Sequence, residues 1–155
     1  MIPIYQTIID PGKGNCMQAA IASLFELPLE AVPNFVELNN PHGVLMQFAL
    51  DKGYNMLGSL YNYPGSEYST IHKLKEDDEL IGINGFFYAS VFSPKYYDVS
   101  KGKNRLAQIT HAVLIDKNYN IVHDPNPNNK GLLKYPEADA YGYNGILDVL
   151  MINEK

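Results

Sequence analysis

The clearest pattern of hydrophobic and polar positions lies near the N-terminus, over residues 14–27. Small and apolar side chains recur there at steps of three and four, the spacing of one buried helical face: Cys16, Ala19, Ala20, Ser23, Leu24 and Leu27. Asn15 suits the N-cap, because its side-chain oxygen can accept hydrogen bonds from first-turn amides that lack helical partners. Pro28 disfavours helical geometry in the residue before it, so the helix is expected to end there.

A second helical region is expected after this first helix. A short turn should occupy residues 29–32, and a helix should run over 41–52. Asn40 could cap that helix, Pro41 suits its first position, and Gly53 suits its C-terminal exit. The side chains that would face the core are Leu45, Phe48 and Ala49.

From residue 54 onward, short apolar runs alternate with polar, turn-forming stretches, which is a pattern typical of strands. We expect strands at 56–60, 79–83, 86–92, 109–116, 119–123 and 146–152. Polar connections are expected at 61–78 and 94–105. The whole chain, 1–155, is therefore predicted to be a single α+β domain in which N-terminal helices pack on a C-terminal antiparallel sheet.

Composition and charge narrow the class of protein. The chain has 155 residues, 46% of them hydrophobic and 19% charged, which fits one globular domain. A net charge of −5 leaves no basic surplus to neutralise phosphates, so we expect no nucleic-acid partner. No apolar run approaches the ~20 residues of a bilayer span, and the first residues lack a signal-peptide pattern, so we expect no membrane partner. A single cysteine excludes an intrachain disulfide and fits a reducing cytoplasm.

That cysteine, Cys16, falls in the first turn of the predicted N-terminal helix. Unpaired amides and the positive end of the helix dipole stabilise an anion there, which lowers the pKa of a thiol. The structural alternative is a small buried hydrophobic residue, because free cysteine is among the most buried residue types. Position alone leaves both interpretations open.

A predicted hairpin supplies partners for the thiol. If the strands 109–116 and 119–123 are joined by a two-residue loop at Lys117 and Asn118, His111 lies directly opposite Asp124. Opposed side chains on one face are close enough for an imidazole to donate to a carboxylate, whereas a one-residue slip would separate them. Such a carboxylate fixes the imidazole and leaves its other nitrogen to face a nucleophile.

Gln6 and Asn15 are the candidate oxyanion- and substrate-binding residues. Gln6 could donate its side-chain amide to an oxyanion from the segment that leads into the helix. The Cys16 backbone amide is the natural second donor. No cofactor is indicated, and the oligomeric state is not determined by these features.

The other titratable candidates carry less chemistry. His123 adjoins Asp124 but alternates to the other face of its strand, so we expect it to be exposed or structural. The same alternation opposes a metal site built from His111, His123 and Asp124, and one cysteine gives no zinc spacing. Asp116 is better explained as a turn residue. No partners are evident for His42 and His72.

Several segments together resemble a group of small phage and bacterial proteins. The shared pattern appears here as Gln6-Thr7, Gly14-Asn15-Cys16, Thr110-His111-Ala112-Val113 and His123-Asp124-Pro125. More distantly, the layout resembles the papain-like cysteine peptidase fold, above all the bacteriocin-leader (double-glycine) peptidases. The resemblance implies Cys16 as nucleophile, His111 as base, Asp124 as orienting carboxylate and Gln6 as oxyanion donor. It also implies the cytoplasm of a host cell if the chain is phage-encoded.

Three functions are compatible with these residues. The first is a cysteine hydrolase acting on an amide or isopeptide bond of a peptide, protein or small amide, through an acyl-thioester. The second keeps the same three residues but transfers the acyl group to an amine or deamidates a protein. The third is a non-catalytic papain-fold binding protein, such as a phage-encoded inhibitor that sequesters a host factor.

Overall fold

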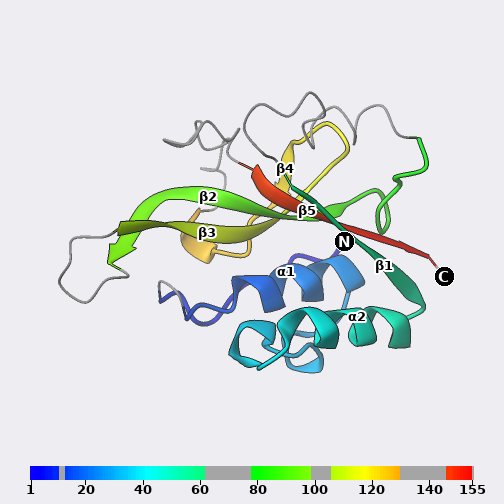
Figure 1. Ribbon diagram of the computed structural model, residues 1–155, viewed down its shortest axis with the longest axis horizontal. Helices are drawn as coiled ribbons and strands as arrows, with labels where there is room; N and C mark the ends of the chain where they lie inside the picture. The colour runs from blue at the N-terminus through cyan, green and yellow to red at the C-terminus, as the bar shows by residue number, and fades with distance from the viewer. Residues whose placement is uncertain (11–12, 62–77, 99–105, 130–145, 155) are drawn as a thin grey trace.

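The described residues of the protein form a five-stranded antiparallel sheet with two α-helices on one of its faces (Figure 1). The structure is a computed structural model that describes residues 1–10, 13–61, 78–98, 106–129 and 146–154. Its principal elements are α1 (Cys16–Phe25), α2 (Pro41–Asp51), β1 (Tyr54–Tyr61), β2 (Phe87–Asp98), β3 (Leu106–Ile115), β4 (Ile121–His123) and β5 (Ile146–Glu154). Three short 3-10 helices are η1 (Leu29–Ala31), η2 (Phe35–Glu37) and η3 (Pro127–Asn129). The predicted α+β class is confirmed.

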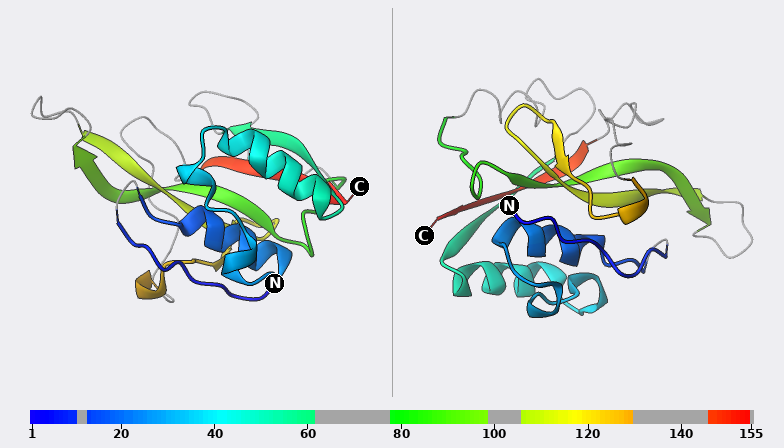
Figure 2. Two further views of the ribbon diagram at one scale, coloured as in Figure 1. Left: turned by 90° about the horizontal axis from the view of Figure 1, so that it is seen from below. Right: turned by 180° about the vertical axis from the view of Figure 1, so that it is seen from behind.

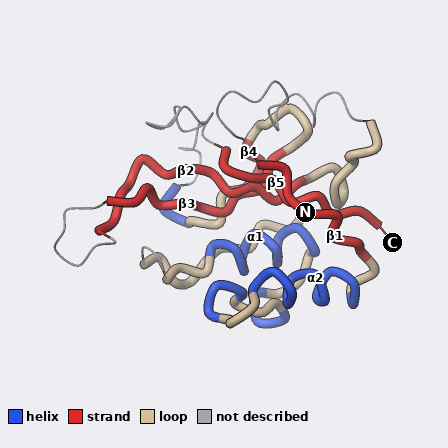
Figure 3. The backbone as a smooth tube through the Cα atoms, viewed as in Figure 1, coloured by secondary structure: helices blue, strands red, loops and turns tan. Residues whose placement is uncertain are grey.

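The strands lie in the order β1-β5-β2-β3-β4. The last strand of the chain, β5, is therefore inserted between β1 and β2 and pairs antiparallel with both. Both helices lie on the same side of this sheet in the two views of Figure 2, and Figure 3 distinguishes the helices from the strands by colour. Among the helices of the described residues, none has the length and apolar character needed to cross a membrane.

The predicted helices form with small changes at their ends. The first helix begins at Cys16 and ends at Phe25, because Glu26 adopts a left-handed conformation, φ 56°, and its amide bonds back to Ala22 and Ser23. A left-handed residue of this kind terminates an α-helix. The second helix matches its prediction, and the Asn40 side chain accepts a hydrogen bond from the Gly43 amide as expected of an N-cap.

The core between helices and sheet fixes where the first helix lies. Small side chains cover the buried face of α1, so the helix packs closely on β2 and β3. The largest side chains in this core are less than 2% exposed: Ile21, Leu24, Phe35, Leu45 and Leu114. A second cluster on β2 and β3 includes Val91, Val113 and Ile115. This packing brings the start of α1 beside β3.

Two sequence predictions in the β region are wrong. Residues 79–83 form turns rather than a strand, because Gly82, Asn84 and Gly85 have positive φ values of 65°, 52° and 81°, which interrupt extended backbone. The predicted connection at 94–105 is strand up to Asp98. A register shift in β2 spans Pro94, and such an irregularity tolerates the missing proline amide. The rest of that connection, and residues 62–77 of the other, lie outside the described residues.

Candidate active site

The thiol of Cys16 lies where the first helix meets the third strand. Cys16 is the first residue of α1, as predicted, and its side chain is partly buried against the core. Its sulfur has backbone hydrogen bonds with Met17, in the same helical turn, and with Ala112 of β3. In its described residues, β4 pairs with β3 only at Leu114 and Ile115, so it does not cover the edge of β3 at Ala112. At Ala112, β3 bonds to the Cys16 sulfur, beyond the last described pair with β4.

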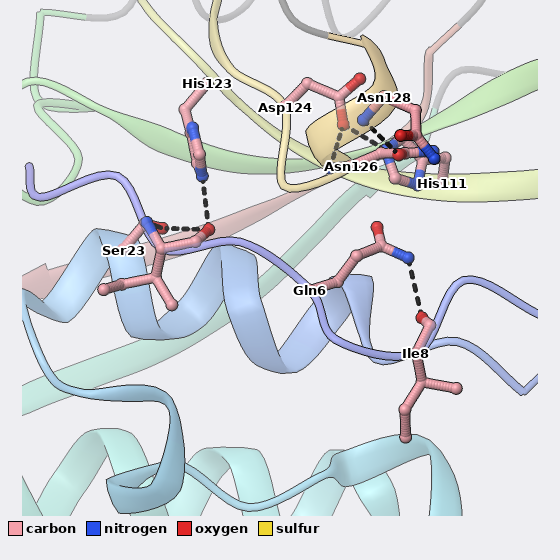
Figure 4. A network of polar contacts seen from close by, with 9 residues as sticks. Gln6, Ile8, Ser23, His111, His123, Asp124, Asn126 and Asn128 are labelled. Atoms are coloured by element: carbon pink, nitrogen blue, oxygen red, sulfur yellow. Dashed lines mark hydrogen bonds and ion pairs between the residues drawn. The ribbon is translucent and has the colours of Figure 1, made fainter.

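His111 links this thiol to a carboxylate. The distance between His111 Nε2 and Asp124 Oδ1 is 2.5 Å (Figure 4). Because Nε2 is used in this way, Nδ1 is left for the hydrogen bond that His111 also makes with Cys16. The side chains of His111 and Asp124 are only 14% and 7% exposed. Three residues from separate parts of the sequence therefore form one hydrogen-bonded chain.

The predicted register of the hairpin is wrong, although the predicted contact forms. Asp116 accepts a hydrogen bond from the Asn120 amide, and Tyr119 has a φ of 69°, so the turn has three residues rather than two. A further shift follows, since Ile115 pairs with Ile121 but Leu114 pairs with His123. Asp124 consequently lies just after β4 and reaches His111 from the strand end instead of from the opposed ladder position. The turn role predicted for Asp116 is confirmed.

The electrostatics favour a thiolate and an imidazolium. Burial alone raises the pKa of the Cys16 thiol, but the hydrogen bond and positive charge of His111 and the two backbone hydrogen bonds lower it overall. Burial alone lowers the pKa of His111, but its bonds with Asp124 and Cys16 raise that pKa to about 9. At neutral pH, His111 is therefore protonated, and its charge stabilises the ionised sulfur.

The loop after β4 fixes the carboxylate. Asp124 Oδ1 accepts a second hydrogen bond, 2.8 Å long, from the Asn126 backbone amide. The Asn126 side chain in turn accepts from the Asn128 amide at 2.9 Å (Figure 4). Asp124 Oδ2 is buried without a hydrogen-bond partner among the described residues. Only one carboxylate oxygen therefore holds the histidine, and this oxygen is itself oriented by the backbone.

Gln6 lies beside the chain that leads into the first helix. Its side chain is 7% exposed, Nε2 donates to the Ile8 carbonyl at 2.9 Å, and its backbone amide donates to the Pro125 carbonyl at 2.9 Å. A Cβ atom placed on Gly14 would be 3.5 Å from Nε2, so the carboxamide passes close to the residues before Cys16. Only one of its two amide hydrogens is needed for Ile8. Gln6 Oε1 is buried without a hydrogen-bond partner among the described residues.

Asn15 occupies the N-cap position, but the prediction that its side chain caps the helix is wrong. Its Oδ1 accepts from the backbone amides of Thr7 and Ile8, at 3.0 and 2.9 Å. Its Nδ2 donates to Thr7 Oγ1 and to Gln18 Oε1, at 3.1 and 3.0 Å. The carboxamide is turned away from the helix because the N-terminal segment offers two amides, those of Thr7 and Ile8, whereas in the helix the Met17 backbone bonds to the Cys16 sulfur.

His123 has a structural role. It is 6% exposed, and its Nε2 donates to the Ile4 carbonyl at 2.8 Å, so the exposed alternative is wrong and the structural one is confirmed. The Ile4 amide bonds to Ser23 of α1 at 2.8 Å, which ties β4 and α1 to one N-terminal residue (Figure 4). Burial lowers the pKa of His123. His42 is exposed on α2, and His72 lies outside the described residues.

Sequence reasoning missed the polar residues that support these groups. Gln18 was not considered, although its position three residues after Asn15 places both on one helical face. Ser23 was assigned to the buried face without a polar role. Within the described part of the chain, no cluster of three or more His, Cys, Asp or Glu side chains is arranged to hold a metal ion.

Comparisons of the chain with protein-family models, with curated proteins and with solved structures find no match.

Proposed function

We propose that the chain is a cysteine hydrolase of papain-like architecture that cleaves an amide or isopeptide bond through an acyl-thioester on Cys16. The observation that carries this proposal is the hydrogen-bonded chain from Cys16 through His111 to Asp124. A cysteine that only packed in the core would not need a buried imidazole whose second nitrogen is held by a carboxylate. Such an arrangement is the structural signature of an activated nucleophile.

In the proposed reaction, His111 donates a proton in the first step and removes a proton in the second. The Cys16 sulfur attacks the substrate carbonyl carbon, and the imidazolium of His111 gives its proton to the leaving amine. This step leaves an acyl-thioester and a neutral imidazole. His111 then removes a proton from water, whose oxygen attacks the thioester and releases the acid. Asp124 keeps Nε2 occupied throughout, so Nδ1 always faces the reacting atoms.

Negative charge on the carbonyl oxygen is assigned to two donors. The second Nε2 hydrogen of Gln6 is one, and the Cys16 backbone amide is the other. Gln6 is supported by its burial and by its fixed contact with Ile8. Asn15 supports the same region but uses all its side-chain polar atoms within the protein, so we do not assign it a direct contact with substrate.

The substrate class is a peptide, a protein or a small amide. A lone thiol that must stay reduced suits a cytoplasmic compartment, in a host cell if the chain is phage-encoded. No observation favours acyl transfer, deamidation or binding alone over hydrolysis. Addition of an amine acceptor distinguishes acyl transfer from hydrolysis, because transfer adds the mass of the acyl group to that acceptor.

The proposal is tested with p-nitrophenyl acetate, an activated acyl donor that requires no knowledge of the natural substrate. We expect wild-type protein to release p-nitrophenolate and to carry an acetyl group on Cys16, seen by intact-protein mass spectrometry. Cys16→Ala should abolish both signals, and His111→Ala should slow acylation by about 100-fold or more. His42→Ala, which changes an exposed histidine, is the matched control. Equal acylation of the His111→Ala and His42→Ala proteins would contradict the proposal.

A further inference from the structure

The orientation of the Gln6 carboxamide depends on a single backbone residue, Ile8. The Ile8 carbonyl accepts two hydrogen bonds, one from Gln6 Nε2 at 2.9 Å and one from the Asn15 backbone amide at 3.2 Å. The Ile8 amide donates to Asn15 Oδ1 at 2.9 Å. Asn15 therefore holds both polar groups of the residue against which Gln6 is oriented.

Asn15 is itself fixed in one orientation. Its side chain is 2% exposed. A rotation of the carboxamide by 180° would place Nδ2 against the Thr7 and Ile8 amides, donor against donor. On the other side, Gln18 accepts from Asn15 and donates to the carbonyls of Leu29 and Val32, at 3.1 and 2.7 Å. The orientation is thus transmitted from the turn after α1 to the segment that carries Gln6.

The approach between the two segments is tight at Gly14, where an added side chain would require the Ile8 carbonyl to shift by a few tenths of an ångström. A Cβ atom there would lie 3.0 Å from the Ile8 carbonyl oxygen and 3.5 Å from Gln6 Nε2. The Gln6–Ile8 segment is therefore packed directly against the residue pair that precedes the nucleophile. A displacement of Ile8 must move the Gln6 amide relative to Cys16.

We infer that Asn15 is a positioning residue, which holds Ile8 so that the free amide hydrogen of Gln6 points to the site where the oxyanion forms. This inference rests on the proposed function and adds a residue that acts through Gln6 without contacting substrate. It explains why a helix-capping residue type gives its side chain to another segment. Preorganised donors of this kind lose much of their effect when they shift by about 1 Å.

Two reagents separate the oxyanion contribution from thiol reactivity. Iodoacetamide is attacked at a saturated carbon and forms no oxyanion, so its rate reports only on the thiolate. With p-nitrophenyl acetate, the Cys16 sulfur attacks the carbonyl, an oxyanion forms, and p-nitrophenolate leaves. The ratio of the acylation rate to the alkylation rate therefore isolates stabilisation of the oxyanion. Circular dichroism of each variant checks that it is folded, because unfolded protein exposes Cys16 to both reagents and would change the ratio by itself.

We expect Gln6→Ala to lower this ratio by about 100-fold and Asn15→Ala by about tenfold. The double variant should be no lower than Gln6→Ala alone, because Asn15 acts through Gln6. Asn15→Asp keeps the acceptor for Thr7 and Ile8 and should restore most of the ratio. Gly14→Ala leaves Asn15 in place but displaces Ile8, so it should lower the ratio as well. Asn40→Ala, at the N-cap of the other helix, is the matched control and should leave the ratio at the wild-type value.

The outcomes distinguish failure of the proposed function from failure of the role assigned to Asn15. If wild-type protein is not acylated on Cys16, the proposed function fails. If acylation is normal and Gln6→Ala lowers the ratio but Asn15→Ala does not, the assignment of Asn15 alone is overturned. An unchanged ratio in Gln6→Ala also overturns it, and so does an additive loss in the double variant.

Discussion

Helices α1 and α2 begin with the same residue type at the N-cap, but the two side chains have different hydrogen-bond partners. Each is preceded by an asparagine at the N-cap position, Asn15 before α1 and Asn40 before α2. Asn40 is exposed and caps its own helix by accepting from the Gly43 amide. Asn15 is buried, makes no such bond, and ties the segment at Thr7 and Ile8 to the helix instead.

The difference shows that α1 lacks the side-chain cap of α2 and that a backbone group of its first turn bonds to the thiol instead. A side-chain cap at α1 would satisfy first-turn amides, whereas in the observed arrangement the Met17 amide bonds to the Cys16 sulfur. A helix start that stays uncapped keeps its amides and its dipole available to an anion. The dipole alone has a modest effect, and the partner that distinguishes α1 from α2 is His111.

Moving the thiol from the start of α1 to the start of α2 should have the largest effect on the acylation rate. In the double variant Cys16→Ala, Pro41→Cys, the only thiol follows Asn40 at the first position of α2, away from His111, Asp124 and Gln6. We expect acylation by p-nitrophenyl acetate to fall by about 10³–10⁴-fold relative to wild type, as the base and the oxyanion donor are both lost. Comparable acylation of the two proteins would mean that any helix start activates a cysteine in this fold.

Removing the carboxylate tests the partner that α2 lacks. Asp124→Asn loses the negative charge that raises the pKa of His111 and fixes its ring, so acylation should fall by about 100-fold or more. Asp116→Asn is the matched control, because Asp116 holds the turn of the same hairpin through Asn118 and Asn120. The rate of p-nitrophenolate release should be near wild type in this control. Equal losses in the two variants would indicate a general defect of the hairpin.

Substitution of Asn15 and of Asn40 should lower the free energy of unfolding by different amounts, and this is the smallest of the expected effects. Asn15→Ala removes four hydrogen bonds of a buried side chain and should lower the free energy of unfolding by about 2–3 kcal/mol. Asn40→Ala removes one exposed capping bond and should cost about 1 kcal/mol or less. Urea denaturation followed by circular dichroism measures both. A loss for Asn40→Ala as large as that for Asn15→Ala would contradict the distinction between them.

Local patterns in the sequence predict the α+β class and the helices α1 and α2, and the structure confirms both. The 3.6-residue period and the prolines define α1 and α2 because both signals act within one helical turn. The chain from Cys16 to Asp124 was predicted from a two-residue turn that does not exist. Asp116 stabilises a longer turn and a second register shift follows it, so the contact arises from a strand end.

What could not be predicted depends on contacts between distant segments. The side chain of Asn15 has the same local sequence signal as a helix cap, and only the position of Thr7 and Ile8 shows its actual partners. Burial of His123 likewise depends on the N-terminal segment that covers it. Strand order is a third example, because no local pattern indicates that β5 inserts between β1 and β2. Such placements are decided by packing of the whole domain.

Activation of Cys16 by His111 can be measured through the pH dependence of Cys16 alkylation in the wild-type and His111→Ala proteins. With one cysteine in the chain, every mass increase after iodoacetamide reports on this residue. In wild type the lowered pKa of Cys16 should keep the alkylation rate high at pH values below the ordinary thiol pKa of ~8.5. In His111→Ala the hydrogen bond and the positive charge are lost while burial and the two backbone hydrogen bonds remain, so the midpoint should move upward from its wild-type position. Coincident profiles for the two proteins, with midpoints near ~8.5, would contradict the account and leave Cys16 as a packing residue.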